Sequence, residues 1–261
     1  MLKFTGVTLA AVLALGACST VRSWEDATPA SARLAPNADY AAALASASRP
    51  EADRARDAAR KPAQLLYLAE VDEGDRVADW IMGGGYFTRV LSAAVGPTGK
   101  VYAYQPAEFV AFRAQYGTDQ DQVAASNANV TPIRTPLTGL RFPEPLDAIV
   151  TIQNYHDLYL KPMPPTAASA TRAELFRALK PGGVLLLVDH SAPDGSGKRD
   201  ADILHRIDKQ TVIDELTAAG FRLESESDLF RLPSDARTAN VFDPSIRGKT
   251  DQFTLKFRKP A

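Results

Sequence analysis

Three consecutive glycines, Gly83-Gly84-Gly85, separate an apolar stretch containing Asp79 from a stretch with helical spacing that begins at Tyr86. Glycine adopts left-handed backbone conformations and lets another group approach the main chain closely. The free N–H groups at the start of a helix bind polar and anionic ligand groups. We therefore expect this turn to hold a nucleotide-like cofactor. The alternative is a tight turn that only packs a strand against a helix.

A second group of polar residues, Asn154-Tyr155-His156-Asp157, directly follows the continuous apolar stretch 146–153. Such a stretch is typical of a strand buried on both faces. Histidine changes its charge near neutral pH, which suits a general base. We therefore interpret His156 as a candidate base, with Asp157 orienting its imidazole. The alternative is a histidine that only forms hydrogen bonds at a strand end.

The chain has two further histidines. His190 follows Asp189 at the end of another apolar stretch, and His205 lies in the polar segment after it. Taken singly, each is an ordinary capping or surface residue. A metal site made from His156, His190 and a carboxylate is an alternative, but the spacing has no tight ligand signature. The sequence prediction therefore includes no metal.

The elements that would position these residues alternate along the chain. Strands are expected at 76–81, 100–105, 129–133, 146–153, 184–188, 221–228 and 252–257, and helices at 86–94, 108–116, 167–179 and 200–219. Alternating strands and helices predict a mostly parallel sheet with helices on both faces. Ligands bind such sheets beyond the carboxyl ends of the strands, which is where both polar groups would lie.

Several motifs resemble those of class I S-adenosylmethionine (SAM) methyltransferases. These are Asp79-x-x-x-Gly83-x-Gly85, the turn Leu179-Lys180-Pro181-Gly182-Gly183 and the strand entry Ala219-Gly220-Phe221. More narrowly, Asn154–Asp157, Asp189-His190, Leu204–Asp208 and Arg247–Asp251 are similar to a group of exported, poorly characterised bacterial predicted methyltransferases. The resemblance covers roughly Gln64 to Lys259. It implies a Rossmann-like α/β sandwich with a seven-stranded, mostly parallel sheet.

The resemblance also implies where a cofactor and an acceptor would bind. SAM would contact Asp79, Gly83, Gly84, Gly85, Tyr86 and Gln105, with its methyl group directed toward 154–156. Asn154 would hold a small-molecule nucleophile, and Tyr155 would form an aromatic wall beside the positive sulfonium. The implied function is methyl transfer to a small-molecule or exported acceptor at the carboxyl edge of the first and fourth strands.

Three positions depart from the family pattern. Ile81 stands where a glycine is usual, and Gln105 stands where an acidic residue usually binds the ribose hydroxyls. The segment Arg134-Thr135-Pro136-Leu137 lacks the acidic residue that often contacts the adenine side. A neutral amide binds a hydroxyl more weakly than a carboxylate does. The alternative function is therefore a non-catalytic, ligand-binding lipoprotein on a methyltransferase fold.

The N-terminus resembles a bacterial lipoprotein leader. A short basic start precedes an apolar run over 4–15, and Leu15-Gly16-Ala17-Cys18 resembles a lipobox in which Cys18, the sole cysteine, is lipidated. We expect a signal peptide at 1–17, an Ala/Ser/Pro-rich tether at 18–50 and a methyltransferase-like domain at 51–261. The protein would be membrane-anchored and face the periplasm. A net charge of −1 without a basic run disfavours nucleic acid as a partner.

Overall fold

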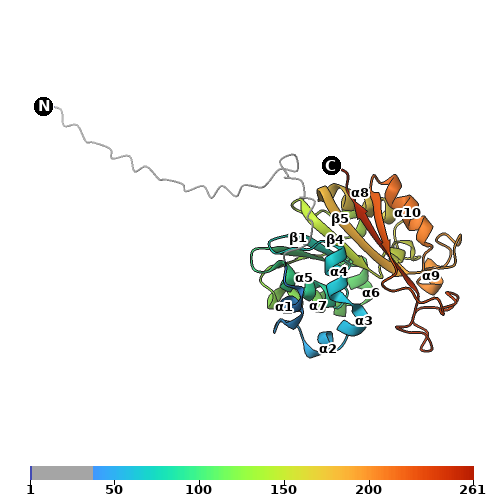
Figure 1. Cartoon of the computed structure of the whole chain (residues 1–261). Coiled ribbons are helices and arrows are strands. Elements are labelled where there is room, and N and C mark those ends of the chain that lie inside the picture. The colour runs from blue at the N-terminus through green and yellow to red at the C-terminus, as the bar shows by residue number, and fades with distance from the viewer. Residues whose placement is uncertain (2–37) are drawn as a thin grey trace.

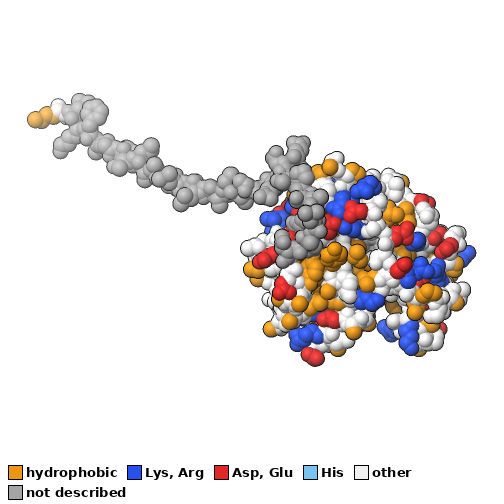
Figure 2. Space-filling view, viewed as in Figure 1, with side chains coloured by type: hydrophobic (Ala, Val, Ile, Leu, Met, Phe, Trp, Pro, Cys, Tyr) orange, Lys and Arg blue, Asp and Glu red, His pale blue; other side chains and the backbone are white. Residues whose placement is uncertain are grey.

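A computed structural model describes residue 1 and residues 38–261. The predicted signal peptide, the lipidation site Cys18 and most of the predicted tether lie outside the described residues. Within the described part, no helix is both long and apolar enough to cross a bilayer. Figure 2 shows basic and acidic side chains interspersed over the visible face of the domain, without a broad patch of one sign.

Seven strands form one sheet in the order β3-β2-β1-β4-β5-β7-β6. Figure 1 labels β1, β4 and β5 in this sheet, with helices packed around it. The strands are β1 Arg76–Trp80, β2 Lys100–Tyr104, β3 Val130–Ile133, β4 Leu146–Ile152, β5 Leu179–His190, β6 Arg222–Ser227 and β7 Gln252–Arg258. Strands β1 to β5 pair in parallel, whereas β7 runs antiparallel to both β5 and β6. The expected mostly parallel sheet is thus a mixed sheet with one antiparallel hairpin. Strand order reverses between β1 and β4, where this fold class binds its ligands.

Helices cover both faces of the sheet, because alternate strand residues point to opposite sides. On one face, Trp80 and Ile149 belong to a core with Leu175 of α8 and Leu216 of α10. On the other, Val77 and Val150 belong to a core with helices α1, α4, α5 and α7. The helices are α1 Tyr40–Ala45, α2 Glu51–Arg54, α3 Asp57–Arg60, α4 Pro62–Leu68, α5 Tyr86–Val95, α6 Ala107–Phe112, α7 Gln115–Ser126, α8 Ala167–Ala178, α9 Ala201–Leu204 and α10 Lys209–Ala218, with short 3-10 helices η1 Leu137–Gly139 and η2 Tyr155–Tyr159.

Part of the stretch assigned from sequence to the tether belongs to the packed domain. Helix α1 lies against α4 and α5, and its Ala43 is buried. The Tyr40 hydroxyl donates to the carbonyl oxygen of Val71 at 2.6 Å. The ordered fold therefore extends several residues upstream of the boundary expected at residue 51.

The long helix predicted over 200–219 is two helices. His205 adopts a left-handed conformation (φ +54°) that ends α9, and α10 begins only after Asp208 caps it by accepting from the Gln210 N–H. The buried Arg206 explains the break, because its guanidinium binds the carbonyl oxygen of Ser191 and the carboxylate of Asp235. These bonds hold the segment between the helices against the end of β5. A continuous helix would carry His205 away from the position described below.

A second difference lies between β2 and β3. The expected helix 108–116 is the shorter α6, and helix α7 follows it without having been predicted. Its start is rich in polar residues and has little helical periodicity. Tertiary hydrogen bonds hold α7 in place instead. The side-chain amide of the buried Gln120 donates to the carbonyl oxygens of Ala103 and Ile133 at 2.8 and 2.9 Å.

Candidate active site

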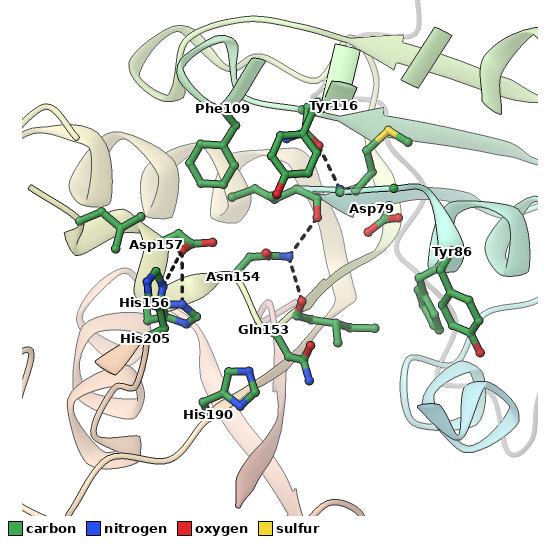
Figure 3. Close-up of a pocket in the computed structure, with 18 of the residues that line it drawn as sticks. Asp79, Tyr86, Phe109, Tyr116, Gln153, Asn154, His156, Asp157, His190 and His205 are labelled. Atoms are coloured by element: carbon green, nitrogen blue, oxygen red, sulfur yellow. Dashed lines mark hydrogen bonds and ion pairs between the residues drawn. The ribbon is translucent and has the colours of Figure 1, made fainter. Parts of the chain in front are cut away.

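A cavity of about 560 Å³ lies at the carboxyl ends of β1, β2, β4 and β5 (Figure 3). Its walls bring together most residues that the sequence analysis selected: Asp79, Gly83, Gly84, Tyr86, Gln105, Asn154, His156, Asp157, His190 and His205. Gly85 and Tyr155 are not among its lining residues. The two polar groups recognised in the sequence therefore share one cavity, as the rule for parallel sheets predicts.

The glycine turn combines open space at one glycine with close packing at another. Gly83 has φ +55°, and a side chain added there would meet no protein atom within 4 Å, so its α-carbon faces open space. Gly85 has φ +78°, and an added Cβ would lie 2.5 Å from Val123 Cγ2. Gly83 therefore leaves room for a ligand, while Gly85 allows close packing between the turn and α7.

Ile81 shows why a glycine is usual at its position. It adopts φ +64°, a region that β-branched residues rarely enter. Its carbonyl oxygen accepts a 2.9 Å hydrogen bond from Asn154 Nδ2, which ties the end of β1 to the segment after β4. The same Asn154 nitrogen also donates to the carbonyl oxygen of Ile152, so the side-chain oxygen of Asn154 is the atom left for a ligand.

Positive φ angles recur around the cavity. Of the non-glycine residues with positive φ in the described chain, Ile81, Gln153 and His205 all line it. Gln153, at φ +66°, follows β4 and donates through Nε2 to Gln252 at 3.0 Å. Such backbone conformations are costly and persist only where the surrounding structure holds them. They occur most often at functional sites.

The hydrogen bonds of the Gln105 side chain show whether the cavity can bind a ribose hydroxyl. Its Oε1 accepts from the Gly83 N–H at 3.0 Å, which sets the orientation of the amide. Its Nε2 is buried and has no hydrogen-bond partner. A buried, unpaired donor is costly, and a ligand hydroxyl oxygen would satisfy it. The substitution of Gln for an acidic residue therefore retains the ability to bind a hydroxyl.

Asp79 lies buried at the end of β1 and accepts a 2.6 Å hydrogen bond from the Thr88 hydroxyl. Burial raises the pKa of Asp79 to about 6, against the opposing effect of the Thr88 hydrogen bonds. A cationic group placed beside this carboxylate would stabilise its charged form. Asp79 therefore suits the ammonium of a bound amino acid moiety.

Tyr86 begins α5 and forms the border between the cavity and the N-terminal helices. Its hydroxyl donates to Asp57 Oδ1 at 2.7 Å, and the guanidinium carbon of Arg56 lies 4.9 Å from its ring centre. Arg60 lies 5.7 Å from the same ring and also lines the cavity. Among the described residues, Arg60 has no ion-pair partner within 4 Å. It is a half-buried cation available to an anionic ligand group.

His156 is held between two carboxylates. Its Nδ1 lies 2.7 Å from Asp189 Oδ1, and its Nε2 lies 3.3 Å from Asp157 Oδ1. Burial alone would lower the pKa of His156, but the charges of Asp189 and Asp157 outweigh it and raise that pKa to about 10. The imidazole is then protonated at neutral pH. The predicted role of His156 as a general base stays a prediction. The carboxylate on Nδ1 is that of Asp189 rather than that of Asp157.

His190 differs sharply from His156. Burial lowers the pKa of His190 to about 4, so its ring is neutral at pH 7. Its Nδ1 lies 2.9 Å from Thr250 Oγ1. The ring centres of His190 and His156 are 6.1 Å apart. The cavity thus contains one cationic and one neutral imidazole on adjacent strand ends.

Tyr155 does not fit the predicted role of a wall beside the sulfonium. Its side chain is fully buried, and its hydroxyl donates to Glu215 Oε2 at 2.8 Å. Tyr159 and Arg172 bind the same glutamate. Tyr155 therefore belongs to a polar cluster that joins η2 to α8 and α10, behind the cavity wall.

Sequence reasoning missed the apolar and basic parts of the cavity. Aromatic and aliphatic side chains also line the cavity: Phe109, Phe112, Tyr116, Leu160, Met163 and Phe242. Phe112 and Phe242 are exposed. Arg56 and Arg60 lie one helical turn apart upstream of the glycine turn, and that spacing was the available signal. The apolar residues are scattered along the chain, so no signal in the sequence showed that they line one cavity.

Comparison with curated proteins gives methyltransferases as relatives. A ubiquinone/menaquinone biosynthesis C-methyltransferase, UbiE, of Pseudomonas aeruginosa is 29% identical over 191 residues, covering 73% of this chain and 65% of the relative. The chain thus matches slightly less than two thirds of that protein's length. No protein-family model matches the chain.

Comparison with solved structures shows the fold. A SAM-dependent methyltransferase from Aquifex aeolicus superposes with a TM-score of 0.55 at 20% identity, covering 78% of this chain and 93% of that one. The cyclase SpnF superposes with a TM-score of 0.57 at 16% identity, covering 85% and 92%. The chain therefore has the class I methyltransferase fold. Because a cyclase shares it, the chemistry must be argued from the site.

Proposed function

We propose that the chain is a SAM-dependent methyltransferase that acts on a small-molecule or exported acceptor at the carboxyl edge of β1 and β4. The observation that carries the proposal is the unpaired, buried Nε2 of Gln105 beside the open α-carbon of Gly83. A ribose hydroxyl would satisfy the donor, and the backbone of the glycine turn would lie against the ligand. The similarity to UbiE methyltransferases supports the same assignment.

The remaining contacts suit the amino acid end of the cofactor. Asp79 would pair with the ammonium and Arg60 with the carboxylate, and both line the cavity near the glycine turn. The paired charges would offset the desolvation of each group. When bound, SAM supplies an electrophilic methyl group on a positive sulfonium.

On the acceptor side, this chain contributes position and charge. Asn154 Oδ1 would accept a hydrogen bond from the acceptor, since Nδ2 is occupied by two carbonyl oxygens. Protonated His156 and neutral His190 would lie beside it. As the acceptor forms its bond to the methyl carbon, the bond from that carbon to sulfur would break and the sulfur would leave as a neutral thioether. The acceptor's proton would leave to solvent or to a neighbouring carboxylate. In-line positioning of the reacting atoms would provide much of the acceleration.

The apolar wall of the cavity points to an aromatic or aliphatic acceptor. Phe109, Leu160 and Met163 would bury such a group, and the exposed Phe112 and Phe242 would guide it in at the mouth. UbiE is named for C-methylation in quinone biosynthesis. An aromatic ring that carries hydroxyl groups is the acceptor class we propose.

We also propose, from the sequence, that Cys18 carries a lipid that anchors the chain at a membrane, with the domain facing the periplasm. Acyl chains on one cysteine would give stable anchoring, at about 0.8 kcal/mol for each buried methylene. Labelling with a radioactive fatty acid in cells, with Cys18→Ala as control, tests this directly. Label retained by the Cys18→Ala variant would contradict it.

Calorimetric titration of the whole chain with SAM tests the central proposal. We expect saturable binding, lost in Gly83→Ala because the new methyl group enters the space of the ligand. Gly248→Ala is the matched control. Gly248 also has a positive φ (+76°) and open space around its α-carbon, but it does not line the cavity. Absence of SAM binding by the folded wild-type chain would overturn the proposal.

Transfer of a labelled methyl group to hydroxylated aromatic compounds separates catalysis from binding. Turnover that His156→Ala abolishes while SAM binding persists would support an enzyme with His156 at its acceptor site. Saturable SAM binding with no transfer to any such acceptor would favour the non-catalytic ligand-binding protein. The three departures from the family pattern, Ile81, Gln105 and the segment after β3, make that second function worth testing.

A further inference from the structure

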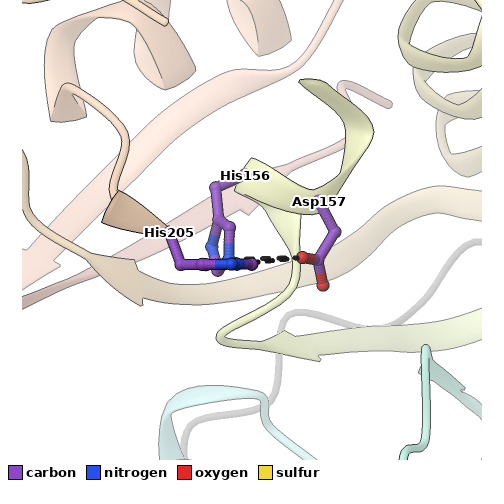
Figure 4. A group of neighbouring side chains, drawn as sticks. All are labelled: His156, Asp157 and His205. Atoms are coloured by element: carbon purple, nitrogen blue, oxygen red, sulfur yellow. Dashed lines mark ion pairs between the residues drawn. The ribbon is translucent and has the colours of Figure 1, made fainter. Parts of the chain in front are cut away.

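We propose that His156, Asp157 and His205 form a binding site for a divalent transition-metal ion of the Zn²⁺ type. These three side chains meet at the acceptor side of the cavity (Figure 4). Each offers one ligand atom, and the three atoms all lie within 4.8 Å of one another. Two imidazoles and a carboxylate form a ligand set that zinc enzymes use, with the remaining position open to water or substrate.

The distances between the ligand atoms are close to those around a metal ion. His156 Nε2 and Asp157 Oδ1 are 3.3 Å apart. Bonds of about 2.0 Å arranged as a tetrahedron place neighbouring ligand atoms about 3.3 Å apart. His205 Nδ1 lies 3.9 Å from the same Asp157 oxygen. Bringing this pair to the tetrahedral spacing takes about half an ångström. The two imidazole nitrogens lie within 4.8 Å of each other, so the half-buried His205 side chain would move toward His156 by at most about 1.5 Å.

Asp189 supplies the outer support that metal-binding histidines characteristically have. Its Oδ1 lies 2.7 Å from His156 Nδ1, and its Oδ2 accepts from the His156 backbone N–H at 2.8 Å. A carboxylate on one ring nitrogen fixes the proton there and directs the other nitrogen to the metal. Asp189 is fully buried, so this support is rigid. Metal binding at Nε2 would displace the proton that this atom carries in the metal-free chain.

The backbone holds the ligands on two separate elements. His156 and Asp157 lie on η2, directly after β4, whereas His205 ends α9 in its left-handed conformation. Helix α9 packs against η2, and Phe242 contacts the His205 ring with 4.8 Å between ring centres. The strained His205 is thus placed by tertiary contacts, and the break between α9 and α10 is what brings it to the site.

His190 lies outside the cluster of His156, Asp157 and His205, whose ligand atoms are within 4.8 Å of one another. Its Nδ1 is engaged by Thr250 Oγ1, and its ring centre is 6.1 Å from that of His156. The metal site considered from sequence therefore has a different third ligand. The open coordination position would face the cavity, where an acceptor hydroxyl could bind and lose its proton more readily. This last step rests on the proposed function.

Calorimetric titration of the whole chain with Zn²⁺ alone, in detergent and without SAM, tests the site. We expect saturable binding of one ion per chain. His205→Ala and Asp157→Asn should each weaken it by at least about 100-fold, and Asp189→Asn by about tenfold or more. His190→Gln is the matched control, a cavity histidine outside the ligand set, and should change the affinity by less than about threefold.

Replacement of Zn²⁺ by Co²⁺ reports the geometry. An intense visible absorption band is expected for a four-coordinate site, and it should be lost in His205→Ala. Circular dichroism checks that each variant is folded. No Zn²⁺ binding by the folded wild-type chain, or equal losses in His190→Gln and His205→Ala, would overturn the proposal. SAM titration of the same samples distinguishes the two proposals, because Zn²⁺ binding without SAM binding would overturn only the methyltransferase function.

Discussion

The Gly83 N–H donates to Gln105 Oε1 at 3.0 Å, and this bond determines which end of the Gln105 amide is free. The pair joins the turn after β1 to the end of β2. Because the oxygen is occupied, the buried Nε2 remains without a partner in the protein. A glutamate at this position would present a second acceptor instead of a donor. The departure at Gln105 thus changes the polarity of the ribose contact.

The first prediction concerns this contact. Gln105→Glu should keep the bond from the Gly83 N–H and add a charged acceptor for the ribose hydroxyl protons. Hydrogen bonds to charged groups are stronger than neutral ones by about 1 kcal/mol, so SAM should bind about five to tenfold more tightly. Gln105→Met, which removes both polar atoms, should weaken binding. Calorimetry with SAM measures both, and weaker binding by Gln105→Glu than by wild type would contradict the prediction.

The second prediction concerns the left-handed backbone of Ile81. Ala is normally more stabilising than Gly in regular structure by about 0.5–1 kcal/mol. At φ +64° the order should reverse, because the left-handed region costs an L-residue about 1–2 kcal/mol. Ile81→Gly should therefore be more stable than Ile81→Ala by about 1 kcal/mol. Ile149 in β4 is the control, because there Ile149→Ala should be more stable than Ile149→Gly. Urea unfolding measures the free energy of unfolding of all four variants. If the Ala variant is the more stable one at both positions, the proposed backbone strain at Ile81 is refuted.

The sequence predicted the central strands β1, β2 and β4 well because they are short apolar stretches with a turn signal beside them. The edge strand β6, Arg222–Ser227, is mostly polar, and β5 is longer than the apolar stretch 184–188 predicted for it. The sequence predicted poorly where a long-range contact decides local structure. The helix break at His205 depends on buried Arg206 binding Asp235, which lies 29 positions away. Helix α7 depends on Gln120 reaching two strand carbonyls. Neither contact leaves a periodic signal in the local sequence.

The same reason explains which site residues were predicted. Residues at the carboxyl end of a strand or just after it, such as Asp79, Asn154 and His156, line the cavity because parallel strands all end at one edge. Tyr155 also follows a strand, but η2 turns its ring inward to Glu215. Arg60 and Phe109 come from helices, and only the folded chain shows that they reach the cavity.

The third prediction is a pH dependence set by Asp79. Burial raises the pKa of Asp79 from 3.8 to about 6, so between these values the folded chain binds more protons than the unfolded one. The stability that this group contributes is then complete below about pH 4 and is lost as the pH rises through 6. This rise in the pKa of Asp79 corresponds to about 3 kcal/mol in the free energy of unfolding. Asp79→Asn should therefore be more stable than wild type at pH 7 and nearly equal to it at pH 4.

Urea unfolding of both proteins at pH 4 and pH 7 measures this difference, and the comparison cancels the titration of all other groups. SAM affinity should show the complementary trend. Binding by the wild-type chain should strengthen as the pH rises from 5 to 7, because the ammonium of SAM pairs with the ionised carboxylate. An Asp79→Asn stability gain that is equal at both pH values would show that Asp79 is ionised throughout.

The fourth prediction separates Tyr155 from the cavity. Tyr155→Phe removes one hydrogen bond to Glu215, which keeps its bonds to Tyr159 and Arg172. The free energy of unfolding should fall by about 1 kcal/mol. SAM affinity should stay unchanged, since Tyr155 does not line the cavity. Unfolding and calorimetry on the same variant measure the two effects. A loss of SAM binding without a loss of stability would restore the role that the sequence suggested.

The last prediction assigns Arg60 to the carboxylate of the cofactor. Arg60 lines the cavity and has no ion-pair partner within 4 Å among the described residues, and burial lowers its pKa without removing its charge. Arg60→Met keeps the aliphatic bulk and removes the charge. SAM affinity should fall by about tenfold or more, as expected for a charge-assisted hydrogen bond. Methylthioadenosine, which lacks the amino acid moiety, should bind wild type and Arg60→Met equally. An equal loss for both ligands would instead mean that Arg60 supports the cavity wall without contacting the carboxylate.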